Sequence, residues 1–392
     1  MSDNGTNREK NALLTAVAQM DERQVSRLKE RLKGKTPGAK KQPAADKRWF
    51  DRKISGLPRD GKEHLQELRE QMMDPGRAHS VDRKWVRYAE TFLKMKMKVP
   101  DFFREPVDVR QLYQRLAQFC REKDLPEEIV ADIVPELVNY IHTGKMRPIL
   151  FVGEKGCGKT TAVRMLMQEA LQIPVETIRI PAVAGSHGMT GDNGTYQSAD
   201  VGSLAKAQLR NNSLLVGYIF DEIDKVPQNN HRTSVDEELL SITDDSVDSI
   251  VDQYLETTLV GLPYCPKFFT GNDFSRINPI LADRCRVVEY PWATPPRIKS
   301  IMTKYAKQKL SEITYRGIEF DYALMNDSID KLVAHNVSSL RKHQTLIELV
   351  LDRAFVESMN AGGAAVKVTE EMFLEAEKKV AAAELRRVGF GA

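Results

Sequence analysis

The sequence lacks any long uncharged apolar run. No stretch approaches the roughly 18 consecutive apolar residues that a membrane-spanning helix needs. The amino-terminal segment MSDNGTNREKNALL also lacks the apolar core of a secretion signal. We therefore expect no membrane contact and a cytoplasmic protein.

Cysteine is scarce as well, and no two cysteines form a CxxC pair. The four cysteines stand far apart in the chain: Cys120, Cys157, Cys265 and Cys285. This spacing excludes a disulfide framework and a cysteine zinc site, and it is typical of proteins in a reducing compartment.

A strong excess of charge of one sign is also missing. The net charge is +3 at pH 7, which is too small to favour binding to nucleic acid. Apolar residues make up 41% and charged residues 29% of the chain, as in folded, soluble proteins. Only residues 31–48 are strongly basic, with Gly, Pro and Ala between the charges. We interpret them as a flexible linker, with contact to phosphate or an acidic surface as the alternative.

Apolar periodicity divides the chain into four segments. Residues 1–48 hold a short amphipathic helix and the linker, and residues 49–145 show helical spacing. In residues 146–290 short apolar runs alternate with helical patterns, as in buried parallel strands joined by helices. Residues 291–392 return to helical spacing. We predict an α/β fold in which a three-layer nucleotide domain with a parallel sheet lies between a helical amino-terminal region and a helical lid.

The sequence predicts three strands within this pattern, and two prolines mark expected helix positions. The strands are ILFV at 149–152, LLVGYIF at 214–220 and KFFTG at 267–271. Pro126 precedes a pair of glutamates and predicts a helix start. Pro135 is expected to begin or kink another helix.

A complete GxxxxGK[ST] motif, known as Walker A, follows the first of these strands and precedes a helical pattern. In such a loop, backbone N–H groups converge on phosphates, and the following helix adds its positive end. Lys159 supplies charge to the β and γ phosphates of ATP, and Thr160 offers its hydroxyl to Mg²⁺. The expected nucleotide contacts are Gly153, Glu154, Lys155, Gly156, Cys157, Gly158, Lys159, Thr160 and Thr161. A redox role for the cysteine is a weaker alternative.

Two adjacent carboxylates end the apolar strand at 214–220. Asp221 is expected to hold Mg²⁺, partly through water, and Glu222 to orient and deprotonate the attacking water. A lone Asp-Glu pair is common on protein surfaces, but its place behind a buried strand and downstream of a phosphate loop favours hydrolysis of ATP.

With these motifs the sequence resembles an AAA+ ATPase, and in particular the ATPase module of Lon, over residues 147–385. The segment DEIDKV at 221–226 is similar to the Lon Walker B motif. GDNGTY at 191–196 is similar to the Lon segment that lines the channel of the ring, which implies that Tyr196 grips an extended polypeptide. An unremarkable tyrosine in a glycine-rich loop is the alternative.

The resemblance continues downstream. The segments EELLSITDD, DQYLETTLVGLPY and KFFTGND follow the Lon order of helix, second channel loop and third strand. Asn272 falls at the sensor-1 position, where an amide hydrogen-bonds the attacking water or the γ-phosphate. An ordinary turn residue is the alternative for this asparagine.

The resemblance to Lon also implies roles for two arginines at the ATPase site. INPILADRCRVVEY is similar to the Lon stretch that ends in Leu-Asp-Arg, which makes Arg284 the arginine finger that completes the neighbouring subunit's site. Arg286 and Arg276 compete for this role, and either could form a structural ion pair instead. SSLR at 338–341 is similar to the sensor-2 turn, so Arg341 is expected to reach the γ-phosphate.

These features together imply a homo-oligomeric motor, a hexameric ring or spiral, that hydrolyses ATP and threads a protein substrate. An ATPase acting on nucleic acid (a translocase, clamp or defence component) and a nucleotide-switched scaffold are the alternatives. Residues 49–145 carry no zinc-finger or RNA-binding signature, which favours a protein substrate. The chain ends at Ala392, so we expect no intrinsic Ser–Lys protease domain.

Overall fold

The computed structural model describes residues 88, 91, 108–183, 188–192, 199–226, 234–244, 250–255, 257–259, 261–315 and 317–388. They divide into two compact units. Among the described residues, the first unit comprises those before 120 together with 131–152 and 160–288, and the second comprises 120–130, 153–159 and 289–388. The domain boundaries expected from the sequence stay predictions.

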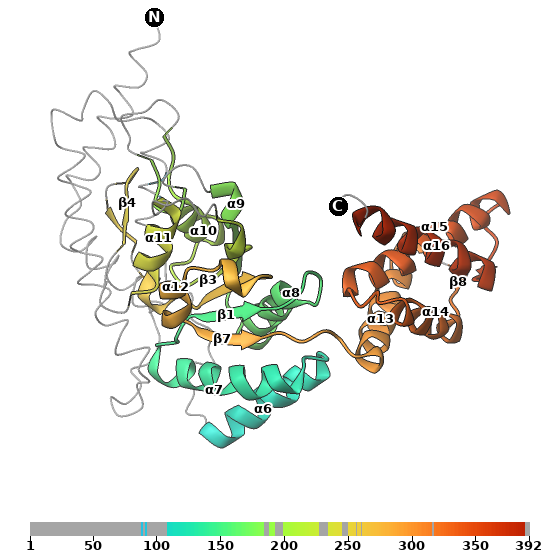
Figure 1. The fold of residues 1–392 in the computed structure, drawn as a ribbon, viewed down its shortest axis with the longest axis horizontal. Helices are drawn as coiled ribbons and strands as arrows, with labels where there is room; N and C mark the ends of the chain where they lie inside the picture. Colours follow the sequence, from blue (N-terminus) through green and yellow to red (C-terminus); the bar gives the residue numbers. More distant parts are fainter. Residues whose placement is uncertain are drawn as a thin grey trace, which may run out of the picture. The chain divides into compact units, whose positions relative to one another are not determined.

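A five-stranded sheet forms the centre of the first unit (Figure 1), in the order β2-β3-β6-β1-β7. The pairings of β2 with β3, β3 with β6 and β6 with β1 are parallel. The strands are β1 Ile149–Val152, β2 Val175–Arg179, β3 Gly217–Asp221, β6 Lys267–Gly271 and β7 Arg286–Glu289. Phe151, Phe220, Phe268 and Phe269 are fully buried and their rings stack across the strands. The predicted buried parallel sheet is confirmed.

The register of the sheet brings three strand ends to one edge. Val152 lies opposite Gly271, and Phe220 lies opposite Phe269, so β6 separates β1 from β3 and all three end together. In open parallel sheets, ligands bind outside the carboxyl ends of the strands. The carboxyl ends of these strands therefore mark the edge of the first unit at which a ligand site is expected.

Helices flank the sheet, with α7 beside β7 (Figure 1). They are α6 Val109–Glu122, α7 Glu127–Thr143, α8 Lys159–Arg164, α9 Ile180–Val183, α10 Ser203–Asn211, α11 Ser234–Ile242 and α12 Pro279–Arg284. A π-helical turn, η3 Met165–Ala170, continues α8. The 3-10 turns are η4 Ile223–Lys225, η5 Leu262–Tyr264 and η6 Phe274–Arg276, and a short antiparallel hairpin joins β4 Val251–Asp252 to β5 Thr257–Thr258.

The proline signals had different outcomes. α7 begins directly after Pro126, as predicted. Pro135 lies inside the same helix, so it does not begin another. Of the helices expected before residue 108, only Tyr88 and Thr91 are described, and both are helical; the rest lie outside the described residues, including those of residues 1–48.

The second unit consists mainly of the four helices predicted for the lid: α13 Pro295–Leu310, α14 Tyr322–Ala334, α15 Leu340–Asn360 and α16 Glu370–Val388. α15 packs on α16 and α13, and α14 packs on α16 and α13. Their buried side chains, among them Ile298, Ile329, Leu346 and Phe373, form one apolar core. The sequence patterns missed the short parallel pair β8 Ile318–Glu319 and β9 Val366–Lys367, and the 3-10 turn η7 Ile313–Tyr315.

No helix within the described part of the chain combines the length and the apolar character that crossing a membrane requires.

Candidate functional site

The glycine-rich loop after β1 has a backbone that only glycine accommodates. Gly156 and Gly158 have φ values of +87° and +107°, in the left-handed region that L side chains avoid. A Cβ on Gly156 would lie 2.2 Å from Ser339 Oγ, and one on Gly153 would lie 2.4 Å from the carbonyl oxygen of Tyr290. The loop therefore packs directly on other parts of the second unit.

The same loop is hydrogen-bonded to the start of α15. The N–H of Leu340 donates to the carbonyl oxygen of Gly156 at 3.1 Å. The next residue, Arg341, is exposed on the first turn of that helix. The fold thus brings the segment predicted as sensor 2 beside the predicted phosphate loop, within one compact unit.

Lys159 is held inside the loop. Its side chain is buried, and Nζ donates to the carbonyl oxygens of Gly153 at 2.5 Å and Glu154 at 2.9 Å. Glu154, Lys155 and Thr161 are exposed. A buried ammonium in a glycine-rich turn next to a helix start is a suitable partner for phosphate oxygens, so these residues fit a nucleoside triphosphate.

Cys157 is fully buried in the same loop. Burial raises the pKa of its thiol, an effect that the charge of Lys159 only partly offsets. The reactive thiolate is therefore disfavoured, and the structure gives no support to a redox role.

Oxygen atoms gather around Asp221 at the carboxyl edge of the sheet. Thr160 Oγ1 donates to Asp221 Oδ1 at 3.3 Å, and Thr270 Oγ1 donates to the same oxygen. Carboxylate and hydroxyl oxygens suit Mg²⁺, which is held by few protein ligands and completes its shell with phosphates and water. The described residues contain no cluster of three or more acidic, His or Cys ligands, and the oxygen set at Asp221 fits magnesium of this kind.

Glu222 follows in a strained conformation. Its φ and ψ of 61° and 44° lie in the left-handed region, which costs a non-glycine residue about 1–3 kcal/mol. Its N–H donates to Thr270 Oγ1 at 3.3 Å, so β6 helps to hold it there. Strain of this kind concentrates at functional sites. Asn272, the predicted sensor 1, is partly exposed just after β6.

Sequence reasoning missed Thr270. It belongs to the predicted strand KFFTG and looked like an ordinary β-branched strand residue. The available signal was its place two residues before Asn272, because the ends of parallel neighbours lie at one edge.

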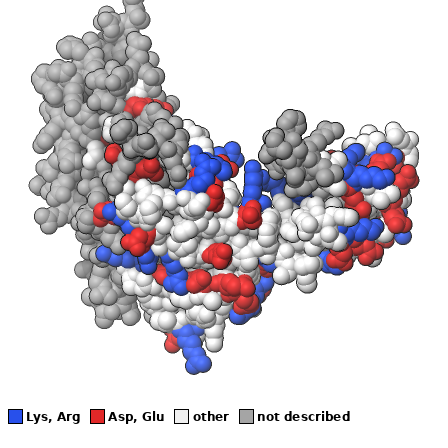
Figure 2. All heavy atoms as spheres, viewed as in Figure 1, with Lys and Arg blue, Asp and Glu red and all other residues white. Residues whose placement is uncertain are grey.

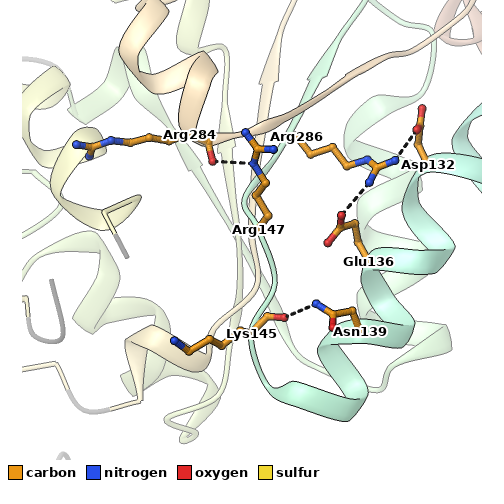
Figure 3. Close-up of polar contacts among 7 residues, drawn as sticks. All are labelled: Asp132, Glu136, Asn139, Lys145, Arg147, Arg284 and Arg286. Carbon is orange, nitrogen blue, oxygen red and sulfur yellow. Dashed lines mark hydrogen bonds and ion pairs between the residues drawn. The ribbon is translucent and has the colours of Figure 1, made fainter. Parts of the chain in front are cut away.

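Arg284 and Arg286, two of the three candidate arginine fingers, point in opposite directions (Figure 3). Arg286 points to α7, where Nη1 pairs with Glu136 and Nη2 pairs with Asp132, both at 2.8 Å. The hydrogen bond to Asp132 is the main cause that raises the pKa of the guanidinium. This residue therefore forms the structural ion pair that the sequence left open.

Arg284 extends from the end of α12 toward α11. Its guanidinium donates to the carbonyl oxygen of Leu240 and pairs with Asp244 at 3.1 Å, with 32% of the side chain exposed. Arg147 fixes its backbone by donating to the carbonyl oxygens of Asp283 at 2.6 Å and Arg284 at 3.3 Å (Figure 3). Arg276 is exposed, and Tyr196 lies outside the described residues.

A buried strand, a glycine-rich loop with an embedded lysine and a helix beginning at that lysine define the class of P-loop nucleotide-binding proteins. Within it, residues 149–291 match the family described as "ATPase family associated with various cellular activities (AAA)". These residues resemble an AAA ATPase domain, and the predicted α/β P-loop fold is confirmed.

The resemblance to Lon is confirmed as well. The chain is 24% identical over 263 residues to a Lon protease homolog of Acanthamoeba polyphaga mimivirus, a match that covers 63% of this chain and 25% of that protein. It is 23% identical over 248 residues to the mitochondrial Lon protease homolog 1 of Dictyostelium discoideum, covering 61% and 25%. The matched region thus spans about a quarter of either relative's length.

The substitution Gly156→Ala tests whether the glycine-rich loop binds ATP. We expect Gly156→Ala to weaken ATP binding at least tenfold, because the methyl group meets Ser339 Oγ and the positive φ disfavours alanine. Binding of a fluorescent ATP analogue measures this loss. The double variant with Ser339→Gly should recover part of it.

Gly362→Ala is the matched control, because Gly362 also has a positive φ of +72°, but a Cβ there would have no atom within 4 Å. It should lower stability slightly and leave ATP binding unchanged. Normal ATP binding by Gly156→Ala would contradict the assignment of this loop to the phosphates.

Proposed function

We propose that this chain is an ATP-hydrolysing motor subunit that assembles with copies of itself and remodels or threads a protein substrate. The observation that carries the proposal is the oxygen cluster at Asp221, which joins the start of α8 to the ends of β3 and β6. It adjoins Glu222, a carboxylate held in a strained backbone. The AAA domain match and the similarity to Lon homologues support the ATPase class.

In this proposal the loop at 153–160 binds the triphosphate through its backbone N–H groups. Lys159 exchanges its carbonyl partners in the loop for phosphate oxygens. Thr160 and Asp221 would hold Mg²⁺, Asp221 partly through water, and the ion would neutralise charge at the phosphates. Glu222 accepts the proton of the attacking water, and Asn272 orients that water.

Arg284 and Arg341 are proposed to act from two directions. Arg341 reaches the γ-phosphate from α15, whose first N–H already bonds the loop. Arg284 serves the site of an adjacent protomer, and head-to-tail contacts of this kind close into a ring or spiral, for which we propose six copies. The engagement of Arg286 by α7 supports Arg284 for this role.

Protein is the proposed substrate. On the side of each unit drawn in Figure 2, basic and acidic side chains of the described residues are interspersed, and no continuous basic area covers either one. A nucleic-acid motor needs a positively charged track along the backbone. Mixed charge on these sides therefore favours polypeptide, and Tyr196 is the proposed contact to it.

Glu222→Gln tests the hydrolytic assignment. The amide cannot accept the proton of water, so we expect ATP binding to persist while turnover falls at least a hundredfold. Steady-state phosphate release and equilibrium binding measure the two quantities separately. Turnover near the wild-type rate would show that another group is the base.

Arg284→Ala tests action between protomers. We expect neither it nor Glu222→Gln to hydrolyse ATP alone, whereas their mixture should regain part of the activity. In mixed assemblies an Arg284→Ala protomer keeps its own glutamate and receives an intact arginine from its Glu222→Gln neighbour. Phosphate release across mixing ratios measures the recovery.

Arg286→Ala serves as the control, because its expected defect is the loss of the α7 ion pairs within its own chain. Mixing it with Glu222→Gln should give no more phosphate release than Arg286→Ala gives alone. A mixture of Arg284→Ala and Glu222→Gln that stayed inactive at every ratio would argue against action in trans.

The substrate is tested through Tyr196. We expect Tyr196→Ala to lose at least tenfold in substrate unfolded per ATP hydrolysed, and Tyr196→Phe to retain it, because the ring provides the contact surface. Unfolding of a tagged fluorescent protein, measured together with phosphate release, gives this ratio.

Stimulation of hydrolysis by single-stranded or duplex DNA, with a steep salt dependence, would favour the nucleic-acid alternative. Nucleotide-dependent assembly with negligible turnover would favour a scaffold.

A further inference from the structure

Residues 188–192 and 199–204 run beside each other in the first unit and are here called the neck. Ser203 N–H donates to the carbonyl oxygen of Gly188 at 2.9 Å, and Asp192 N–H donates to that of Asp200 at 3.1 Å. A Cβ on Gly202 would lie 2.1 Å from the carbonyl oxygen of Met189. The two halves of the neck are therefore in close backbone contact.

The neck is also attached to the β4–β5 hairpin and to α11. The N–H of Gln253 donates to the carbonyl oxygen of Thr190 at 2.7 Å. Glu238 of α11 accepts from both the N–H and the hydroxyl of Thr190. Two elements remote in sequence thus hold the same residue of the neck.

Asp252 makes the second link from the hairpin. Its side chain is completely buried, Oδ1 accepts from the N–H groups of Tyr254 at 3.1 Å and Leu255 at 2.9 Å, and Oδ2 accepts from Gly202 N–H at 2.8 Å. One oxygen therefore shapes the hairpin, and the other fastens the hairpin to the neck. Hydrogen bonds to a charged acceptor are stronger than neutral ones.

We propose that Asp252 is a positioning residue that joins the neck to the β4–β5 hairpin, so that movement produced by ATP turnover reaches the substrate-contacting segment between the two halves of the neck. This rests on the proposed function, because that segment contains Tyr196. In this proposal Asp252 takes no part in hydrolysis, which is assigned to the residues around Asp221.

The charges around Asp252 make the link sensitive to pH. Burial raises the pKa of Asp252 to about 6, while its three backbone hydrogen bonds and the charge of Lys206 on α10 lower it. Lys206 is paired with Asp200 at 3.1 Å, and Glu238 lies on the α11 side of the neck. The charged carboxylate is thus present above about pH 6 and is lost as the pH falls.

Protonation has two opposite effects. Because the folded pKa is raised, the neutral form favours folding and the charged form costs stability as the pH rises through about 6. The proton is expected on Oδ2, which accepts one N–H where Oδ1 accepts two. The link to Gly202 therefore weakens in acid although the fold is retained.

Asp252→Asn tests the link with little change in shape. The amide oxygen can replace Oδ1 and preserve the hairpin, whereas the amide NH₂ then faces the N–H of Gly202. We expect hydrogen exchange of the peptide covering 199–204 to rise at least tenfold, and substrate unfolded per ATP to fall at least fivefold. Hydrolysis without substrate should stay within about twofold of wild type.

Asp200→Asn is the matched control, because it removes the same charge from the neck itself, where the Asp200 side chain accepts from the N–H of Val201 and pairs with Lys206. It should behave as wild type. A second measurement needs no variant: wild-type exchange of 199–204, corrected for the intrinsic pH dependence, should increase between pH 7.5 and 5.5, and Asp252→Asn should abolish that pH dependence.

The outcomes separate this inference from the proposed function. Unchanged exchange in Asp252→Asn and in the wild type at pH 5.5 would overturn the link. Raised exchange with unaltered unfolding per ATP would overturn the positioning role. If the wild type unfolds no polypeptide and polypeptide does not stimulate its hydrolysis, the proposed function fails, and exchange alone then decides whether Asp252 joins the neck to the hairpin.

Discussion

Oδ1 of Asp221 accepts hydrogen bonds from Thr160 at the start of α8 and from Thr270 at the end of β6. One oxygen atom thereby connects a helix and two strands that meet at the carboxyl edge of the sheet. The parallel order β3-β6-β1 makes this meeting possible, because β6 alone separates the strands that precede the two ATPase motifs. Glu222 is held by the same arrangement, since its N–H bonds Thr270. The position of the proposed base thus depends on β6 as much as on its own strand.

The phosphate loop imposes a second constraint, inside the other unit. Its glycines leave no space for side chains against Tyr290 and Ser339, and its carbonyl at Gly156 accepts the first N–H of α15. A helix start carries N–H groups that need acceptors, and the loop supplies one. In the proposed function, a rearrangement of the loop on binding or releasing phosphate would alter the contact at the start of α15. This is a direct physical route by which nucleotide state can influence the lid.

Some of this could be predicted from the sequence and some could not. The strands at 149–152 and 267–271 were predicted at their observed bounds, because short apolar runs bounded by turn residues favour buried strands. The run at 214–220 was predicted too early, since β3 begins at Gly217 and ends at Asp221. β2 and β7 were missed, since VETIR and RVVE mix charged with apolar residues and gave no continuous run. The choice between Arg284 and Arg286 depends on Asp132 and Glu136, which are distant in sequence and reach Arg286 only through the packing of α7 on β7.

Asp252 illustrates the same limit for function. In the sequence, the aspartate of DQYL looks like an ordinary turn residue. Its role could not be predicted, because one of its three N–H donors, that of Gly202, comes from a segment fifty residues away. Burying a charged group is costly, and an apolar side chain of similar size would remove that cost. An apolar residue, however, would leave the N–H groups of Gly202, Tyr254 and Leu255 without their acceptor. A serine has one acceptor oxygen where this geometry uses two. A short, two-pronged acceptor therefore satisfies both the hairpin and the neck, and its charge strengthens the bond that crosses between them.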